Sequence, residues 1–166
     1  MVKACTSLGM YTEVLTASTG GRHIVFSTGS GVYAATAQQG SEGSPVIPLI
    51  WKPKLGSEDH AAQVSAGQKH VVMCSKKGEL WSWGTPPSCP GSAVSEVSMP
   101  CLEMSLLGTK VVKVSAGGFH TALCTDRGAV YTFGQGGKGR LGHGGENHEM
   151  SPRRVEALSA ECITEV

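Results

Sequence analysis

Three histidines recur at the same place in a repeated motif, and they are the side chains best suited by type to do chemistry. His23, His70 and His120 are separated by 47 and then by 50 residues. In each copy a glycine lies three residues before the histidine, and another lies eight residues after it. Imidazoles serve as metal ligands and general bases, but three of them form one site only if the fold brings them together.

A glycine-rich run is the second candidate for a functional site. Gly134 to Gly139 reads GQGGKG, which matches the G-x-G-x-x-G pattern of phosphate-binding loops. Such a loop requires a following helix, because the amides at the start of that helix hold the phosphates. The next residues, Arg140 to Gly145, read RLGHGG, which disfavours a helix. No acidic residue follows at the spacing of a βαβ unit, so the sequence predicts no cofactor.

The six cysteines form no recognisable metal or disulfide pattern. Cys74 and Cys124 occupy the same position of the repeat, and Ser27 takes that position in the first copy, which favours a small residue packed inside a sheet. We therefore predict reduced thiols, no metal site, and an intracellular location, either cytoplasmic or nuclear. The sequence also contains no G-x-S-x-G or H-E-x-x-H motif, so we expect no enzyme activity and no catalytic residues.

The histidines belong to a repeat whose clearest copy is Val111 to Gly134, VVKVSAGGFHTALCTDRGAVYTFG. β-Branched and apolar residues flank the turn sequence Asp126-Arg127-Gly128, which predicts a β-hairpin. A second copy aligns without gaps from Val64 to Gly84, and a fainter one runs from Ser18 to Thr36. The recurring positions, which we interpret as structural, are Gly20, His23 and Gly31, then Gly67, His70, Gly78 and Gly84, and finally Gly117, His120, Gly128 and Gly134.

A period near 50 residues, with short strands and 23 glycines, favours the blades of a β-propeller over a helical solenoid. The motif resembles the repeat of the regulator of chromosome condensation family, V-x-x-V-x-A-G-x-x-H-x-x-A-L-T-x-x-G-x-V-Y-x-W-G. The third copy fits best, and Gly139 to Gly142, Pro152 and Val155 match the tail of that repeat. The first copy departs most, with Thr19 in place of the alanine. The resemblance implies an all-β fold, an incomplete arc of blades from a seven-bladed type of propeller.

This fold also decides how the histidines are interpreted. Equivalent positions lie on separate blades, so the three imidazoles cannot converge on one metal or one catalytic site. We therefore interpret them as partly buried side chains that bond to nearby backbone. We predict a single domain, residues 1–166, with repeats at about 14–63, 64–113 and 114–166. Because Ile163 to Val166 matches the start of another repeat, we expect either a fragment of a longer protein or an arc capped by a partner or by self-association.

Charge narrows the choice of partner. Lys and Arg number 14, Asp and Glu number 13, and no basic stripe stands out, so nothing indicates nucleic-acid binding. No apolar stretch reaches the length of a membrane span. The predicted binding surface is the loop Gln135 to Glu149, because loops on a rigid scaffold commonly carry function. Its candidate contact residues are Gln135, Lys138, Arg140 and His143.

Two functions remain open at this point. The first is a non-catalytic protein-interaction module, for which the loop charges would contact a partner; the alternative for those charges is that they only solvate a long loop. The second is guanine-nucleotide exchange on a small GTPase. The resemblance implies it, since the founding member of the family acts on Ran and also binds chromatin. The expected partners are a protein such as a small GTPase, or further propeller blades of the same parent chain.

Overall fold

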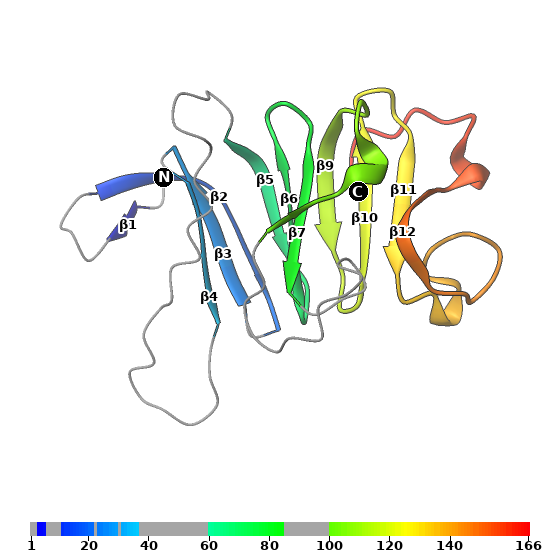
Figure 1. Ribbon diagram of the computed structural model, residues 1–166, viewed down its shortest axis with the longest axis horizontal. Helices are drawn as coiled ribbons and strands as arrows, with labels where there is room; N and C mark the ends of the chain where they lie inside the picture. The colour runs from blue at the N-terminus through cyan, green and yellow to red at the C-terminus, as the bar shows by residue number, and fades with distance from the viewer. Residues whose placement is uncertain (1–2, 6–10, 22, 30, 37–59, 85–99) are drawn as a thin grey trace.

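The protein consists of β-strands and short 3-10 helices within the residues that the structure describes (Figure 1). The computed structural model describes residues 3–5, 11–21, 23–29, 31–36, 60–84 and 100–166. Their strands form three four-stranded antiparallel sheets, and each sheet is built from strands that follow one another in the chain. The predicted all-β fold of short antiparallel strands is confirmed.

The first sheet contains β1 (Lys3–Cys5), β2 (Tyr11–Gly20), β3 (His23–Thr28) and β4 (Gly31–Thr36). The second contains β5 (Ala61–Ala66), β6 (His70–Ser75), β7 (Leu80–Gly84) and β8 (Cys101–Leu102). The third contains β9 (Val111–Ala116), β10 (His120–Thr125), β11 (Val130–Gly134) and β12 (Glu149–Arg154). Three 3-10 helices lie between or after them: η1 (Met104–Leu106), η2 (Gly137–Gly139) and η3 (Glu156–Leu158).

The central hairpins of the second and third sheets have the same turn. Gly78 and Gly128 close these turns with φ of 92° and 76°, a conformation that a side chain disfavours. Their amides donate to the carbonyls of Ser75 and Thr125, each at 2.9 Å. The hydroxyls of Ser75 and Thr125 accept hydrogen bonds from the amides of Glu79 and Ala129, the residues that directly follow the turn glycines. These bonds fix the turn further.

The first sheet differs at this turn. Ser27 is paired with Val32 across the hairpin, whereas Cys74 at the equivalent position is paired with Leu80. The first hairpin is therefore one residue shorter, and Gly31 begins β4 instead of closing the turn as the ungapped alignment placed it. The alignment could not detect this difference, because Gly31 lies eight residues after His23, just as Gly78 lies eight residues after His70.

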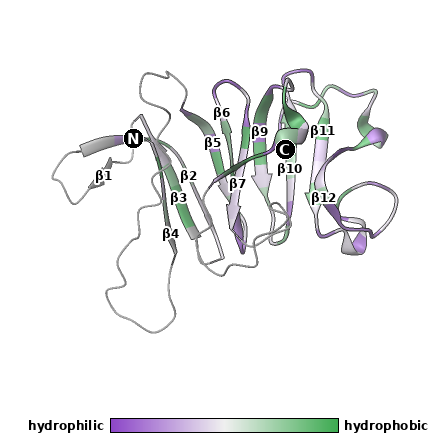
Figure 2. Ribbon diagram, in the orientation of Figure 1, coloured by the Kyte–Doolittle hydropathy of each residue, from purple (hydrophilic) through white to green (hydrophobic). Residues whose placement is uncertain are grey.

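The core lies between the sheets. Apolar side chains of the first and second sheets form one cluster, which includes Val25, Val32, Met73 and Trp83, with Trp81 packed against it. A second cluster lies between the second and third sheets and is centred on Val72, Leu80, Leu123 and Phe133. Figure 2 shows hydrophobic residues along the inner strands, while hydrophilic residues colour much of β12. Each sheet therefore depends on its neighbour to bury its faces.

The inner strands of neighbouring sheets are also joined by hydrogen bonds from backbone to side chain. The Ala116 amide donates to Ser65 Oγ at 2.9 Å, and the Val114 amide donates to Gln63 Oε1 at 3.0 Å. The same bond recurs one sheet earlier, where the Ala66 amide donates to Ser18 Oγ at 3.1 Å. A serine two residues before the repeat glycine thus accepts from the next sheet.

The last residues of the chain lie against the outer face of the third sheet. The Ile163 amide donates to the Gly128 carbonyl at 3.1 Å, just as the Val111 amide donates to the Gly78 carbonyl at 3.0 Å. Ile163 and Val166 pack on the cluster formed by Cys124, Val130 and Val155. This segment therefore occupies the place that the start of β9 takes on the second sheet.

The predicted repeat limits remain a prediction. The limits at residues 64 and 114 fall within β5 and β9, and parts of the first two predicted repeats, residues 37–59 and 85–99, lie outside the described residues. None of the helices in the described part of the chain is long and apolar enough to cross a membrane.

Candidate protein-interaction surface

The repeat histidines lie in three different sheets, at the start of β3, β6 and β10. His70 is buried, and its Nε2 lies 2.9 Å from Thr121 Oγ1 of the next sheet. The sequence led us to expect a backbone partner for this ring, and a contact to a side chain of another sheet was not foreseen. The side chain of His23 is outside the described residues.

His120 has a different environment from His70. Its ring lies against Gly117, and its Nδ1 is buried without a hydrogen-bond partner among the described residues. Burial lowers the pKa of His120 below its usual value, and the nearby positive charge of Arg140 lowers it further. The ring is therefore neutral at physiological pH.

No arrangement of reactive side chains is evident in the described part of the chain. No three His, Cys, Asp or Glu side chains there lie close enough together to hold a metal ion. Burial raises the pKa of Cys74 to about 11, and burial also raises the pKa of Cys124. Both thiols are protonated at neutral pH, so neither is an activated nucleophile.

The loop between β11 and β12 is held in one shape by its own contacts. Thr132 Oγ1 donates to the Leu141 carbonyl and lies 3.0 Å from His143 Nε2, while Leu141 is fully buried. The Gly136 amide donates to His148 Nδ1 at 3.0 Å. Hydrogen bonds to β11 at one end and across the base of the loop therefore hold a glycine-rich segment against the third sheet.

The four residues predicted for binding are placed differently within this loop. Gln135, Lys138 and Arg140 are exposed, and Lys138 sits in η2 with φ of 63°. Arg140 Nε donates to the Gly137 carbonyl at 2.7 Å, so its guanidinium is held close to η2. His143 is half-buried and is engaged by Thr132. Lys138 and Arg140 are therefore two neighbouring exposed cations, in and directly after η2. His143 instead connects the loop to β11 through Thr132.

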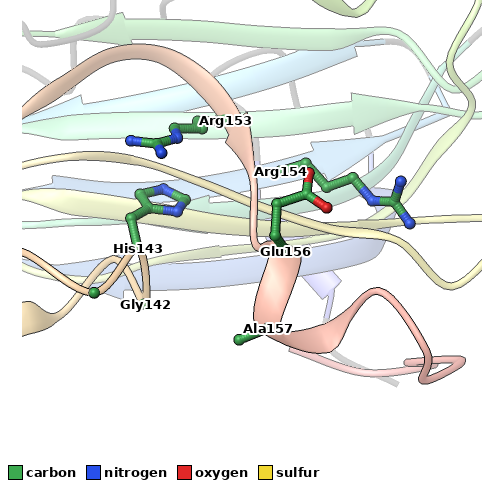
Figure 3. A pocket seen from close by; sticks show the side chains of 7 residues that line it. Gly142, His143, Arg153, Arg154, Glu156 and Ala157 are labelled. Carbon is green, nitrogen blue, oxygen red and sulfur yellow. The ribbon is translucent and has the colours of Figure 1, made fainter.

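A shallow hollow of about 250 Å³ lies beside the loop. His143 and Arg153 line it on one side, and Arg154 and Glu156 line it on the other (Figure 3). Arg153 forms an ion pair with Glu149 at 2.5 Å. Sequence reasoning missed Arg153 and Arg154, although the two adjacent arginines directly after the loop were the available signal.

Comparison with known proteins identifies the repeat. Two models of the regulator of chromosome condensation (RCC1) repeat match the chain, one at residues 111–140 and the other at residues 127–166. The chain carries RCC1 repeats. The matched residues include β9 to β12, the loop and η3, so the candidate surface lies within the recognised repeats.

A curated relative with an RCC1-like segment is the human "Probable E3 ubiquitin-protein ligase HERC4", which is 37% identical over 121 residues. The match covers 72% of this chain and 11% of that protein, so the chain spans about a tenth of the length of this relative. Ligase activity is a property named for that whole protein and does not follow for these repeats.

Two solved structures have the same fold. Human WBSCR16 superposes with a TM-score of 0.66 at 24% identity, covering 86% of this chain and 40% of that one. Prp20p from Saccharomyces cerevisiae gives a TM-score of 0.65 at 18% identity, covering 86% and 38%. The three sheets of this chain are therefore blades of the RCC1 type of β-propeller.

Proposed function

We propose that this chain is a non-catalytic module that binds a protein partner through the loop between β11 and β12. The observation that supports this most is the shape of the loop. Its backbone is fixed by Thr132, Leu141 and His148, while Lys138 and Arg140 extend from its surface. A loop that is already ordered loses little conformational entropy when it binds, which favours recognition.

The partner of this surface is expected to present carboxylates to Lys138 and Arg140. Arginine binds a carboxylate through two parallel hydrogen bonds, which adds geometric selectivity to the charge attraction. Arg154, on the far side of the hollow, offers a further guanidinium within the same repeat. These cations are exposed, so we expect them to affect the association rate and its salt dependence strongly.

The test is a double variant, Lys138→Asn with Arg140→Gln, in quantitative pull-down from cell extract. Asparagine is chosen because it tolerates the positive φ of Lys138 better than most residues do. Arg127→Gln is the control, since it removes an exposed cation at the turn between β10 and β11, at the opposite end of β11 from the loop. We expect partners recovered by the natural protein and by the control to be lost from the loop variant. Equal recovery in all three samples would exclude this loop as the binding surface.

A second candidate function is guanine-nucleotide exchange. It is supported by the likeness of fold to Prp20p, whose structure is described together with its binding properties to Gsp1p and histones. Exchange would require a propeller surface to compete with the contacts that hold the nucleotide, and no covalent step is involved. Release of a fluorescent guanine nucleotide from a loaded small GTPase such as Ran tests this directly. An unchanged release rate with excess chain would exclude exchange on that GTPase.

A further inference from the structure

A groove of about 250 Å³ lies between the β6–β7 turn and the segment that follows η1. Leu106 forms its floor and is only 6% exposed, and Lys77, Leu107 and Lys110 are among the residues that line it. The groove lies at the strand ends that carry the turns, because the Asp126 amide of the next turn donates to the Lys110 carbonyl. The loop that carries Lys138 begins at the opposite end of β11, so the two surfaces are separate.

The backbone on both sides of the groove is fixed. The Val111 amide donates to the Gly78 carbonyl at 3.0 Å, and the Thr109 amide donates to the Leu106 carbonyl at 2.9 Å. Gly78 is packed so closely on Lys110 that a Cβ would overlap its side chain. At the start of η1, Glu103 accepts from the Ser105 amide at 3.2 Å and from its hydroxyl at 2.7 Å. The groove is thus already formed in the unbound protein.

Two large apolar side chains of the η1 segment are exposed, and one of them, Leu107, lines the groove. Met104 is 64% exposed and Leu107 is 57% exposed. They are three residues apart along a 3-10 turn, and that spacing brings side chains onto one face. Scattered apolar side chains on a surface are ordinary, whereas a pair next to a preformed groove is typical of a docking surface. Methionine in particular is enriched at interfaces.

Lysines predominate among the charged residues of the segments that form the groove. Lys76, Lys77 and Lys110 are exposed, and neither Lys76 nor Lys110 forms an ion pair within the described residues. Glu79 also lines the groove, where it accepts from the Trp81 indole at 3.2 Å, and Glu103 accepts from the Ser105 amide. Lysines therefore outnumber carboxylates by three to two on the segments that form the groove.

We infer that the groove between Lys77 and Lys110 is a second docking surface, which binds an acidic peptide segment carrying an apolar anchor residue. The anchor packs on Leu106, Leu107 and Met104, and the flanking carboxylates pair with the lysines. Such an anchor in a pocket contributes most of the affinity at a small interface, while the exposed charges select the partner and its orientation. A nucleic acid supplies the negative charge but no flexible aliphatic anchor for the apolar pair.

The probe is a fluorescein-labelled peptide, Glu-Asp-Glu-Leu-Leu-Glu-Asp-Glu, measured by fluorescence anisotropy with the full chain. We expect saturable binding that weakens at least tenfold for Leu107→Ser and at least threefold for Lys110→Gln. Lys138→Asn, at the opposite end of the strands, should leave the affinity unchanged. Glutamine retains the part of the Lys110 side chain that packs on Gly78, and circular dichroism checks that both variants remain folded.

Two further ligands decide the chemistry of the partner. A peptide with both leucines replaced by serine should lose most of its affinity. In a sedimentation assay, phosphatidylserine vesicles should not bind the chain in a way that depends on Leu107. Equal binding of the serine peptide would overturn the role of the apolar anchor. No saturable binding of the leucine peptide, or vesicle binding that is lost in Leu107→Ser, would overturn the proposal of an acidic peptide partner.

Discussion

The two faces of the third sheet are built from the same repeat, yet they have different surroundings. The inner face is covered by the second sheet, where Ser65 accepts from Ala116 and His70 meets Thr121. On the outer face, Ser115 and His120 occupy the equivalent positions, and neither Ser115 Oγ nor His120 Nδ1 has a hydrogen-bond partner among the described residues. The repeat motif therefore encodes one half of each contact, and the next sheet supplies the other half.

The same difference appears at the glycines beside these histidines. A Cβ on Gly67 would overlap the Gly117 carbonyl oxygen, which belongs to the backbone of the neighbouring sheet. The three atoms nearest to a Cβ on Gly117 all belong to the imidazole of His120, which lies on the outer face. Identical glycines thus differ in whether a fixed backbone or a movable side chain limits the space. The predictions below test this contrast.

The largest effect is expected from Gly67→Ala compared with Gly117→Ala. Gly67→Ala forces two inner strands apart and should lower the free energy of unfolding by about 3 kcal/mol. Gly117→Ala should cost about 1 kcal/mol, because the His120 ring can turn aside. Chemical denaturation followed by tryptophan fluorescence measures both. Equal losses would show that the outer face is as tightly closed as the inner one.

A smaller contrast is expected between Ser65→Ala and Ser115→Ala. Ser65→Ala leaves the Ala116 amide without its acceptor in a partly buried junction, and should cost about 1 kcal/mol. Ser115→Ala removes a hydroxyl with no partner among the described residues and should change stability by less than about 0.5 kcal/mol. The same denaturation experiment applies. A loss at Ser115 as large as the loss at Ser65 would reveal a contact on the outer face.

The outer face should also have its own pH dependence. The pKa of His120 is lowered by burial and then by Arg140, from an ordinary value of 6.5. The unfolded chain therefore takes up a proton first as the pH falls, so stability should decline from near pH 6.5 down through the lower pKa of the folded state. NMR titration of the imidazole should show the lowered pKa, and Arg140→Gln should raise it. A pKa at or above 6.5 in the natural protein would contradict the burial of this ring.

The smallest effect concerns the terminal segment. Lys113 and Glu165 form an ion pair of 3.2 Å, but their side chains are 38% and 74% exposed. Glu165→Gln should therefore cost no more than about 0.5 kcal/mol, and the cost should vanish at high salt. Ile163→Ala should cost more, since Ile163 packs on the cluster around Val130. A larger loss for Glu165→Gln would mean that charge, and not packing, holds this segment in place.

The sequence predicted the fold better than the contacts between sheets. Turn glycines and β-branched strands are local signals, so the hairpins at Gly78 and Gly128 could be predicted. The contact between His70 and Thr121 could not be predicted, because the two residues lie 51 positions apart and meet only when the sheets pack. The hollow was missed for a similar reason, since Arg153 approaches His143 only after β12 pairs with β11. The binding role of the loop residues remains a prediction.

The close approach of Gly67 to the Gly117 carbonyl has a consequence for the curvature of the arc. The strands of a sheet are spaced by about 4.8 Å, so the fourth strand lies roughly 14 Å from the first. The same small tilt between the sheets at β5 and β9 therefore produces a larger displacement at β8 and β12, which lie at the outer edge of the arc. The contact between η1 and β12 lies at this outer edge. It therefore depends on the two glycines near the axis, and a single methyl group added at Gly67 would change it.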